Sequence, residues 1–487
     1  MGGMIVTKFG GSSLESAGRI EQAGSIVKQH LNRNPVVIVS AMGKTTDRLQ
    51  EAVRCAARGD SYSAGQQYEV LRRMHCNETR VLLGQRAEPF LRDTILPLFH
   101  ELQALLAALI DGRQFTPEIQ DEALSHGERI SSLIVAEAFR HMGINAAQVD
   151  ARKVIVTGDQ FTHAQPLYWD TYARLRRTVA LVARDRVVVM GGFIGATREG
   201  VTTTLGRGGS DLSASLVGAG ISADEIQIWT DVDGMLTCDP RMLTGGHRLR
   251  EITYQEAQEM ARFGAKVLHP AAIAPVLRQR IPMVIRNSYR PEGEGTRLVP
   301  RLENEPGIVK CLTSKKGMAV VRMRVRNQGM LSSITDGLAG LFASSHISVD
   351  LIETDAQGIS FAVENWHGLP EVLRQVDAAV HIRVEEDRAA VWLVGEGIAQ
   401  VPATLARAQA ALRGMEVRLT SQGSSSLSLG FAIRETDLPA AMEALHREFF
   451  AAPDTRIFAA PEPAAWHAPQ AAARVRPAGR PQPAIAH

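Results

Sequence analysis

The stretch Thr202-Thr-Thr-Leu-Gly-Arg-Gly-Gly-Ser-Asp211 is a polar, glycine-rich loop between a predicted strand and a predicted helix. The strand, residues 186–195, is an unbroken apolar run of the kind that is buried on both faces of a parallel sheet. The helix begins near residue 212, where Ser210 or Asp211 is placed to cap it. Glycines let the backbone approach a ligand, and free N–H groups at a helix start attract an anion. The loop therefore predicts a phosphate-binding site, with an ordinary strand-to-helix connection as the alternative.

The composition limits the classes of protein to which this chain can belong. Its 487 residues exceed one compact core, so two or three domains are expected. The 54 basic and 52 acidic residues nearly cancel, which argues against nucleic acid or an anionic membrane surface as a partner. The four cysteines are far apart and form no metal-binding pattern, which fits a reducing cytoplasm. We expect neither secretion nor a membrane span, because no apolar segment reaches 18 residues.

A second loop of the same kind follows the first predicted strand, residues 4–9. Lys8 stands at the carboxyl end of this strand, and Gly10, Gly11 and Ser12 lead into a helix. Backbone N–H groups and an ammonium placed in this way can bind a polyphosphate. The spacing of a Walker A loop is absent, and so is a complete Gly-x-Gly-x-x-Gly fingerprint. A dinucleotide site is therefore disfavoured.

Other polar residues follow other predicted strands. Ser40 and Thr46 come at and after the end of an apolar strand, and ligands of open α/β sheets bind outside the carboxyl ends of strands. Glu128 lies beside a glycine in an otherwise apolar helical pattern. A solvent-facing position is the alternative for this glutamate. Strands and helices alternate up to a strand at residues 282–287, as in an α/β domain.

Five motifs, in this order and at this spacing, resemble those of the aspartokinase family. They are Lys8-Phe-Gly-Gly-Ser12, Gly206-Arg-Gly-Gly-Ser-Asp211, Trp229-Thr-Asp-Val-Asp-Gly234, Asp239-Pro-Arg241 and Phe263-Gly-Ala-Lys-Val-Leu-His-Pro270. The resemblance extends over residues 4–458. Five co-linear motifs are a far more specific signal than one glycine loop.

The resemblance implies an α/β fold in two parts. Residues 1–300 are expected to form a three-layer amino-acid-kinase domain with a mostly parallel central sheet. Two α+β, ferredoxin-like ACT modules are expected to follow at residues 315–386 and 387–459, where the pattern of strands and helices repeats. Residues 460–487 are rich in Ala and Pro without apolar periodicity and are predicted to be a disordered tail.

The activity implied by the resemblance is phosphorylation of the aspartate β-carboxylate by ATP. This carboxylate is already a nucleophile at neutral pH, so no general base is required. The site must instead offset the repulsion between anions with cations, oriented N–H dipoles and Mg²⁺ on the phosphates. By resemblance, Lys8 and Lys266 bracket the transferred group, and Asp211 orders the lysines.

The resemblance also implies which residues contact each ligand. Aspartate is expected to contact Ser40, Thr46, Glu128 and Arg207. The nucleotide is expected to contact Gly10, Gly11, Ser12, Gly208, Gly209, Ser210, Thr230, Asp231, Leu236, Arg241 and Val267. An amino-acid effector is expected at the ACT modules, near Met330, Asp350 and Asp355. Asp355 has an alternative role as a cap of its own turn.

Two other functions are alternatives at this point. The chain could phosphorylate another carboxylate, or a nucleotide, with the same fold; the paired ACT modules argue against this. It could also be an amino-acid sensor without catalytic activity, which the presence of Lys8, Asp211 and Lys266 argues against. A homodimer is expected, because ACT modules commonly pair their sheets. The sequence does not identify the end-product pathway, and any metal beyond Mg²⁺ stays unassigned.

Overall fold

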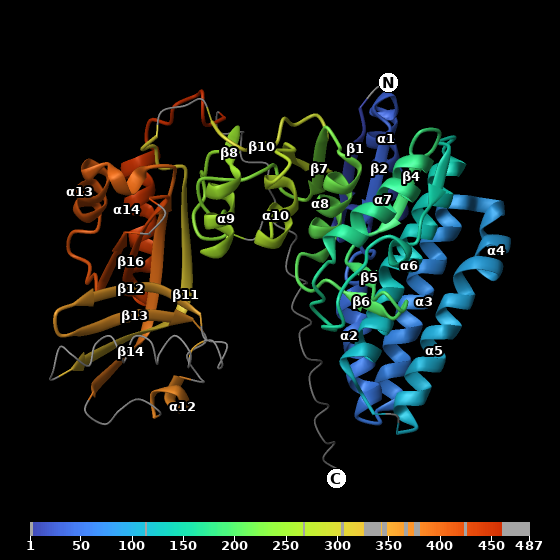
Figure 1. Cartoon of the computed structure of the whole chain (residues 1–487), viewed down its shortest axis with the longest axis horizontal. Coiled ribbons are helices and arrows are strands. Elements are labelled where there is room, and N and C mark those ends of the chain that lie inside the picture. The colour runs from blue at the N-terminus through green and yellow to red at the C-terminus, as the bar shows by residue number, and fades with distance from the viewer. Residues whose placement is uncertain are drawn as a thin grey trace, which may run out of the picture.

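The computed structural model describes residues 3–112, 114–265, 268–302, 306–325, 342, 348–364, 369–374, 380–422 and 426–459. Figure 1 shows two parts side by side, with the amino-terminal part on the right and the carboxyl-terminal part on the left. Each part is built around its own sheet, one of eight strands and one of six. We call them the catalytic part and the regulatory part.

The eight-stranded sheet of the catalytic part has β1 (Ile5–Phe9) near its centre. β1 pairs in parallel with β2 (Pro35–Val39) on one side and with β7 (Glu225–Thr230) on the other. The sheet order is β3-β4-β2-β1-β7-β9-β10-β8, and only the β9–β10 pair is antiparallel among the described strands. The remaining strands are β3 (Ala146–Gln148), β4 (Val187–Gly191), β8 (Glu251–Thr253), β9 (Met283–Asn287) and β10 (Thr296–Val299). The expected mostly parallel sheet is confirmed.

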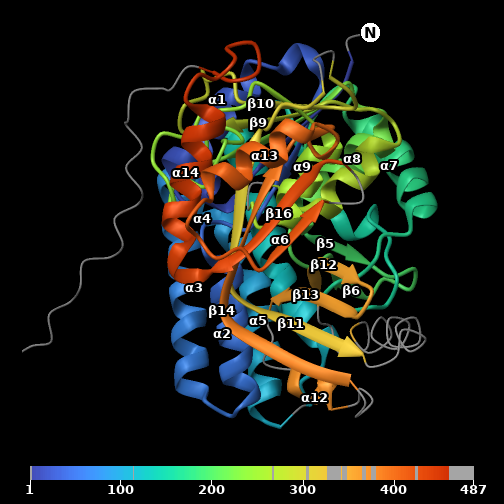
Figure 2. The ribbon, with the colours of Figure 1, turned by 90° about the vertical axis from the view of Figure 1, so that its left-hand side faces the viewer.

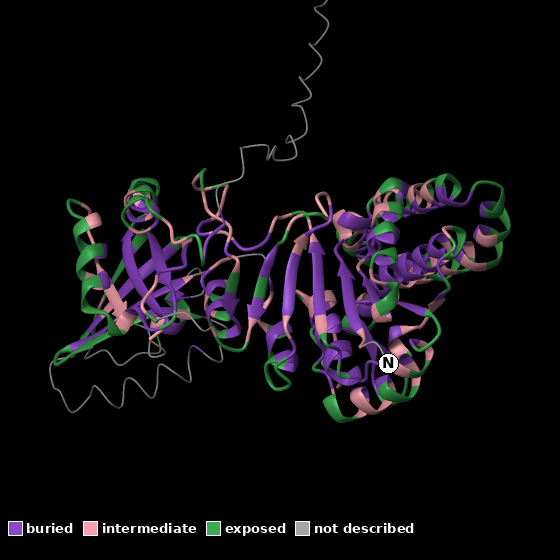
Figure 3. Ribbon diagram, turned by 90° about the horizontal axis from the view of Figure 1, so that it is seen from above, coloured by how far each residue is buried: buried purple, intermediate pink, exposed green. Residues whose placement is uncertain are grey.

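Helices cover both faces of this sheet, which gives three layers (Figure 3). The apolar residues of β2 are buried on both faces of the sheet. Val36 and Ile38 lie in one buried cluster, and Val37 and Val39 lie in the other. One layer consists of α7 (Tyr168–Val182), α8 (Gly209–Ile221), α9 (Tyr254–Arg262) and α10 (Ile273–Leu277). The other consists of α1 (Ala17–Lys28), α2 (Thr45–Ala57), α3 (Ser61–Leu83), α4 (Ala87–Phe90), α5 (Leu96–Ile110) and α6 (Pro117–His141).

One helical stretch of this second layer bears on the expected absence of a membrane span. Among the described residues, the stretch Ser61–Ile110 contains an 18-residue window with the length and composition of a membrane span. Its apolar side chains have packing partners here, since Leu102, Leu106 and Leu109 lie in the same buried cluster as residues of α2 and α6. An apolar stripe of this kind is also what a helix needs to pack into a helical layer.

The six-stranded sheet of the regulatory part is antiparallel and is shared by two modules (Figure 2). Its two central strands, β11 (Cys311–Val325) and β14 (Val380–Val394), run through both modules. The outer strands are β12 (Val349–Asp355) and β13 (Gly358–Glu364) on one side, and β16 (Ser428–Arg434) and β15 (Leu419–Gln422) on the other. The described helices are α12 (Leu369–Leu373), α13 (Pro402–Ala411) and α14 (Leu438–Phe450).

The pairing of the long strands refines the expected boundaries of the two modules. The residues 311–314 precede the expected start of the first module at 315, yet they pair with residues 391–394 in the sheet of the second. The boundary expected at 386/387 lies inside β14, where Asp387 has a positive φ of 55°. The register of β11 against β14 also shifts beside Gly317. The modules therefore meet at irregularities within continuous strands and not at a linker.

α9 joins the catalytic part to the regulatory part. The ring of Phe263, which follows α9, stacks on Trp392 of β14 with ring centroids 4.5 Å apart. On the same helix, the fully buried Glu256 forms an ion pair of 2.7 Å with Lys310, just before β11. A buried aromatic pair and a buried ion pair thus hold the two parts together.

Candidate active site

A cleft of about 360 Å³ opens at the carboxyl ends of β1, β2 and β4, beside the start of α8. Ten residues expected in the site from the sequence line it: Lys8, Gly11, Ser40, Thr46, Glu128, Arg207, Gly208, Gly209, Ser210 and Asp211. They come from segments up to about 200 positions apart in the chain, which the parallel sheet brings to one edge. The residues Ala41, Gly43, Lys44, Asp47, Phe193 and Gly206 complete the lining.

The glycine-rich loop enters the cleft from a hairpin formed by β5 (Ile194–Ala196) and β6 (Thr202–Thr204). Gly206 and Gly208 have φ values of 74° and 73°, a left-handed conformation that residues other than glycine rarely adopt. The expected cap was wrong: the N-cap of α8 is Gly208, and no side chain caps the helix. The left-handed turn at Gly208 starts the helix without a cap, and this leaves the carboxylate of Asp211 available for another partner.

That partner is Lys8. Its ammonium lies 2.6 Å from Oδ1 of Asp211, and the two side chains are 11% and 14% exposed. An ion pair so nearly enclosed holds the ammonium in one place at the floor of the cleft. The first motif and the glycine-rich loop thus meet as a single unit.

The glycine-rich loop is anchored from behind by Asp121, which sequence reasoning did not single out. This fully buried carboxylate on α6 accepts hydrogen bonds from the backbone N–H of Thr204 at 2.8 Å and from its hydroxyl at 2.6 Å. It also accepts one from the N–H of Thr162 at 2.8 Å. Burial raises the pKa of Asp121, although these donors oppose the shift. Asp121 stands in the sequence between Gln120 and Glu122, so nothing local distinguishes it from a solvent-facing acidic residue.

Glu128 is buried at the wall of the cleft, which rules out the solvent-facing alternative. Its side chain is 3% exposed, and Oε1 accepts a hydrogen bond of 3.1 Å from the N–H of Ala41. No described group donates to the buried Oε2. Burial raises the pKa of Glu128 to about 8. The site therefore holds one carboxyl group that a cation entering the cleft would stabilise in its charged form.

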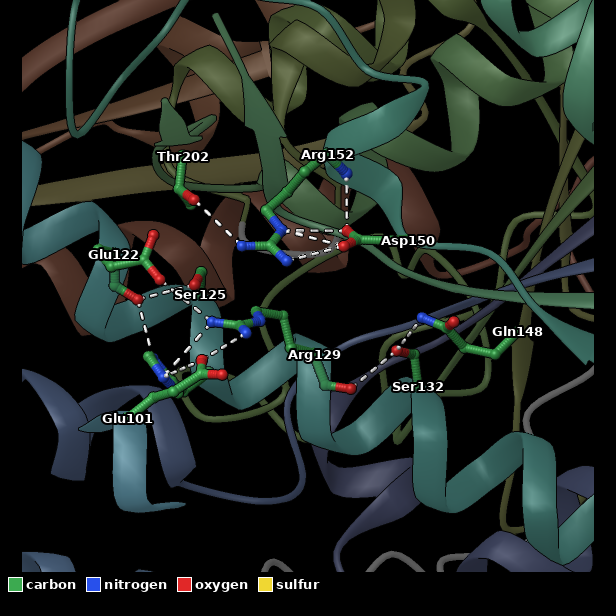
Figure 4. A network of polar contacts seen from close by, with 10 residues as sticks. Glu101, Glu122, Ser125, Arg129, Ser132, Gln148, Asp150, Arg152 and Thr202 are labelled. Carbon is green, nitrogen blue, oxygen red and sulfur yellow. Dashed lines mark hydrogen bonds and ion pairs between the residues drawn. The ribbon is translucent and has the colours of Figure 1, made fainter. Parts of the chain in front are cut away.

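A polar network fixes the helix that carries Glu128 (Figure 4). The neighbouring Arg129 forms an ion pair of 2.7 Å with Glu101 of α5. Across the network, Arg152 forms an ion pair of 2.8 Å with Asp150 and donates a hydrogen bond of 3.3 Å to Thr202 of β6. The contacts of Arg129 therefore join α5 to α6, and those of Arg152 hold the strand that leads into the glycine-rich loop.

Several residues expected to contact the nucleotide lie outside this cleft. Thr230 and Asp231 stand at the end of β7, where the hydroxyl of Thr230 donates to Asp231 at 3.2 Å. Leu236 and Arg241 lie farther along the loop that follows β7, and Arg241 forms an ion pair with Asp239 at 2.6 Å. Gly10 and Ser12 flank Gly11 in the chain and are not among the residues that line the cleft. Lys266, Val267 and Met330 fall outside the described residues.

The sequence profile of the Amino acid kinase family matches residues 3–287, and that of an ACT domain matches residues 391–449. Over 462 residues the chain is 30% identical to lysine-sensitive aspartokinase 3 of Escherichia coli, covering 92% of this chain and 100% of the relative. It is also 30% identical over 468 residues to chloroplastic aspartokinase 1 of Arabidopsis thaliana, covering 92% of this chain and 80% of the relative. The chain belongs to the aspartokinase family. The resemblance read from the five motifs is confirmed.

Solved aspartokinases have the same arrangement of both parts. The crystal structure of E. coli aspartokinase III in complex with aspartate and ADP, in the R state, matches with a TM-score of 0.80 at 30% identity. That match covers 92% of this chain and 100% of the other. The T-state structure of the same enzyme with lysine and aspartate matches with a TM-score of 0.76 at 29% identity. The expected fold, a kinase domain followed by ACT modules, is confirmed for this aspartokinase.

Two residues expected at an effector site, Asp350 and Asp355, have partners within the aspartokinase chain itself. Both carboxylate oxygens of Asp350 on β12 accept hydrogen bonds of 2.9 Å from the ammonium of Lys315 on β11. Asp355 accepts a hydrogen bond of 2.7 Å from the N–H of Gln357, so it caps its own turn, as the alternative had it. An ammonium-bearing effector would have to displace Lys315 to reach Asp350.

Proposed function

We propose that this aspartokinase transfers the γ-phosphoryl group of ATP to the β-carboxylate of L-aspartate and forms 4-phospho-L-aspartate. This would be the first step of aspartate-family amino-acid biosynthesis. The observation that carries the proposal is the charge pattern of one 360 Å³ cleft, which combines the Lys8–Asp211 pair, Arg207 and the buried Glu128. Aspartate carries one ammonium and two carboxylates, and this set of groups complements all three.

We assign each charge of the substrate to a side chain of the cleft. Arg207 binds the α-carboxylate, because a guanidinium can hold a carboxylate with two parallel hydrogen bonds. Glu128 accepts the α-ammonium on its free oxygen Oε2, and Ser40 and Thr46 complete the pocket. The β-carboxylate then points to Lys8. N-acetylated substrates lack the ammonium that the buried Glu128 requires.

The chemical step needs charge stabilisation and alignment more than proton transfer. The carboxylate attacks the γ-phosphorus as the bond to the β,γ-bridging oxygen of ATP breaks, and ADP leaves. Lys8, held by Asp211, and the N–H groups at the start of α8 near Gly208 and Gly209 lie where negative charge would accumulate. We assign the second cation to Lys266. Mg²⁺ enters with ATP as part of the substrate and draws charge from the phosphates.

We place the nucleotide beside the aspartate cleft, over the end of β7. β7 pairs directly with β1, with Trp229 opposite Phe9, so Thr230 and Asp231 lie next to the strand end that carries Lys8. The loop that follows carries Leu236 and Arg241. Gly10, Gly11, Ser12, Ser210 and Val267 would complete the nucleotide contacts. ATP bound there would extend its phosphates toward Lys8.

A substrate panel tests this function. The purified protein, ATP and Mg²⁺ are incubated with aspartate, glutamate or N-acetylglutamate, and release of ADP is followed by a coupled assay. We expect a kcat/KM for aspartate that exceeds the other two by at least about 10², because the cleft matches both the length and the ammonium of aspartate. Equal or better turnover of another carboxylate would contradict the substrate assignment.

The buried Glu128 predicts how aspartate binding depends on pH. With a pKa of about 8, this carboxyl is mostly protonated at pH 7 in the free enzyme, and it must ionise to bind an ammonium. The KM for aspartate should therefore fall about tenfold between pH 7 and pH 9, until the amine of the substrate itself loses its proton. Initial rates against aspartate at fixed, saturating ATP measure this.

The control for this prediction is Glu128→Gln, which cannot ionise. This variant should have a raised KM for aspartate that hardly changes over the same pH range, with an unchanged KM for ATP. A wild-type KM for aspartate that is flat from pH 7 to pH 9 would show that ionisation of Glu128 does not control binding.

Weak or absent inhibition by lysine alone is a further prediction. The family resemblance implies a serine at the position of Asp355 in lysine-inhibited relatives, and a carboxylate there would oppose the carboxylate of an inhibitor. The internal pair of Lys315 and Asp350 adds a second obstacle, because it already neutralises the acid that could meet an amino group. Initial rates against lysine, threonine and both together, at sub-saturating aspartate, provide the test. Strong inhibition by lysine alone would contradict this prediction.

We further propose that the enzyme is a cytoplasmic homodimer that associates through its regulatory sheets. Ile352 on β12 and Val384 on β14 are large apolar side chains exposed on this sheet, at 52% and 38%. Exposed apolar residues on a sheet are suited to contact with a second copy. Light scattering of wild-type protein and of an Ile352→Lys variant tests this assembly.

A further inference from the structure

The loop between β7 and β8 is held by the regulatory part and not only by the catalytic part. Within this loop, Leu236 forms a β-bridge with Arg248, which makes the loop a short hairpin with Arg241 near its tip. The base of the hairpin is tied to the catalytic part through the N–H of Met235, which donates to Thr296 at 2.9 Å. The contacts from the regulatory part come from residues after 310.

Thr237 is the residue of the hairpin that contacts both β11 and α14 of the regulatory part. This fully buried residue follows Leu236 directly, and its carbonyl accepts a hydrogen bond of 2.7 Å from the N–H of Leu312 on β11. Its hydroxyl lies 3.1 Å from Nε2 of His446 on α14 and accepts a hydrogen bond of 3.0 Å from the N–H of His247. The hydroxyl has therefore one proton left, which it can donate to a neutral His446.

His446 is suited to that role as a neutral acceptor. Its ring stacks on the ring of His247 with centroids 6.1 Å apart and an angle of 11° between the planes. Burial, followed by the neighbouring His247, lowers the pKa of His446. A neutral imidazole at neutral pH presents one acceptor nitrogen to the hydroxyl of Thr237.

The segment after α14 pairs with the second arm of the same hairpin, residues 248–250. The N–H of Arg250 donates to the carbonyl of Ile457 at 2.8 Å, and the N–H of Ala459 donates to the carbonyl of Arg248 at 2.8 Å. Between these two contacts Leu249 forms a β-bridge with Phe458, whose ring also packs edge-on against His247. The residues 454–459 therefore add a short extended segment to the hairpin, where the described chain after α14 reaches the catalytic part (Figure 1).

We infer that the carboxyl-terminal end of the chain, through His446 and the residues 454–459, positions the hairpin for nucleotide binding. The inference rests on the proposed function, in which Leu236 and Arg241 contact the nucleotide. Leu236 and Thr237 are neighbours, so a shift at Thr237 moves Leu236 directly. His446 and Phe458 are positioning residues in this account, because they act on the nucleotide through the hairpin. They lie apart from the aspartate cleft, so they should affect ATP affinity and leave aspartate affinity unchanged.

The test compares four variants with the wild type. His446→Leu removes the acceptor, and His446→Gln restores one with a similar reach. A variant that ends at Ala452 removes the added segment, and its matched control ends at Ala459 and keeps it. For each protein we would measure the KM for ATP and for aspartate, kcat at saturation, and the Kd for ADP by titration calorimetry.

We expect His446→Leu to raise the KM for ATP and the Kd for ADP about three- to tenfold, the range for one neutral hydrogen bond. The KM for aspartate should stay within twofold, and His446→Gln should return most of the lost affinity. The variant ending at Ala452 should lose at least about tenfold in ADP affinity, because it also loses two backbone hydrogen bonds and a buried ring. The variant ending at Ala459 should match the wild type.

Unchanged ADP affinity in His446→Leu would overturn the inference, and so would an equal rise of both KM values. His446→Leu keeps the test valid even if the shorter variant does not fold, because this substitution changes a single half-buried side chain. The proposed function fails separately, if the wild type shows no aspartate-dependent turnover. In that case the Kd for ADP still decides whether His446 positions a nucleotide site.

Discussion

Lys8→Met should lower the kcat for aspartate phosphorylation by about 10²–10³-fold, the usual loss when one preorganised donor to the transition state is removed. The ammonium of Lys8 is the cation of the cleft that the structure holds in one position, through the 2.6 Å contact with Asp211. Methionine keeps the length and the apolar stem of lysine, so the change removes the charge and little packing. Steady-state rates and thermal unfolding of both proteins measure the two effects.

Two controls separate a catalytic role of Lys8 from a structural one. Asp211→Asn keeps the ammonium of Lys8 but removes the carboxylate that holds it in position. We therefore expect a loss of rate smaller than that of Lys8→Met. The exposed Lys153→Met should leave kcat unchanged, since this lysine lies outside the cleft. Near wild-type kcat in Lys8→Met, with a normal KM for ATP, would remove Lys8 from the reaction.

Arg207→Ala should raise the KM for aspartate about tenfold to 150-fold, while the KM for ATP stays within about twofold. A hydrogen-bonded pair between a guanidinium and a carboxylate in a partly enclosed site stabilises binding by roughly 1.5–3 kcal/mol, which converts to this range. Initial rates over both substrates measure the two constants. Arg198→Ala is the matched control, because Arg198 lies on the neighbouring hairpin and pairs with Asp170 at the surface. A loss of ATP affinity with unchanged aspartate saturation would move Arg207 to the phosphate side.

The residues of the cleft could be predicted because each follows a strand of a parallel sheet. β1, β2 and β4 end at the same edge, so Lys8, Ser40 and the glycine-rich loop had to converge there once the strands were identified. The short spacing between Arg207 and Asp211 then placed both charges in one loop. Glu128 was harder to predict, because a glutamate in a helical pattern is solvent-exposed in most proteins.

Other features depend on contacts that no local pattern reports. Asp121 anchors Thr204 from 83 positions away, and nothing in either segment indicates the partner. The pairing of the residues 311–315 with the second ACT module depends on how β11 and β14 twist past each other. The missing side-chain cap of α8 follows from the left-handed Gly208, which begins the helix and places Asp211 in its first turn, where the carboxylate pairs with the distant Lys8.

Hydroxylamine trapping tests the central claim most directly. An acyl phosphate reacts with hydroxylamine to give a hydroxamate, which a ferric salt turns into a coloured complex. We predict hydroxamate formation by the wild-type protein that requires both ATP and L-aspartate, with the signal of Lys8→Met lower by about 10²–10³-fold. Absence of hydroxamate with aspartate, together with a signal from another carboxylate, would contradict the claim that this cleft phosphorylates aspartate.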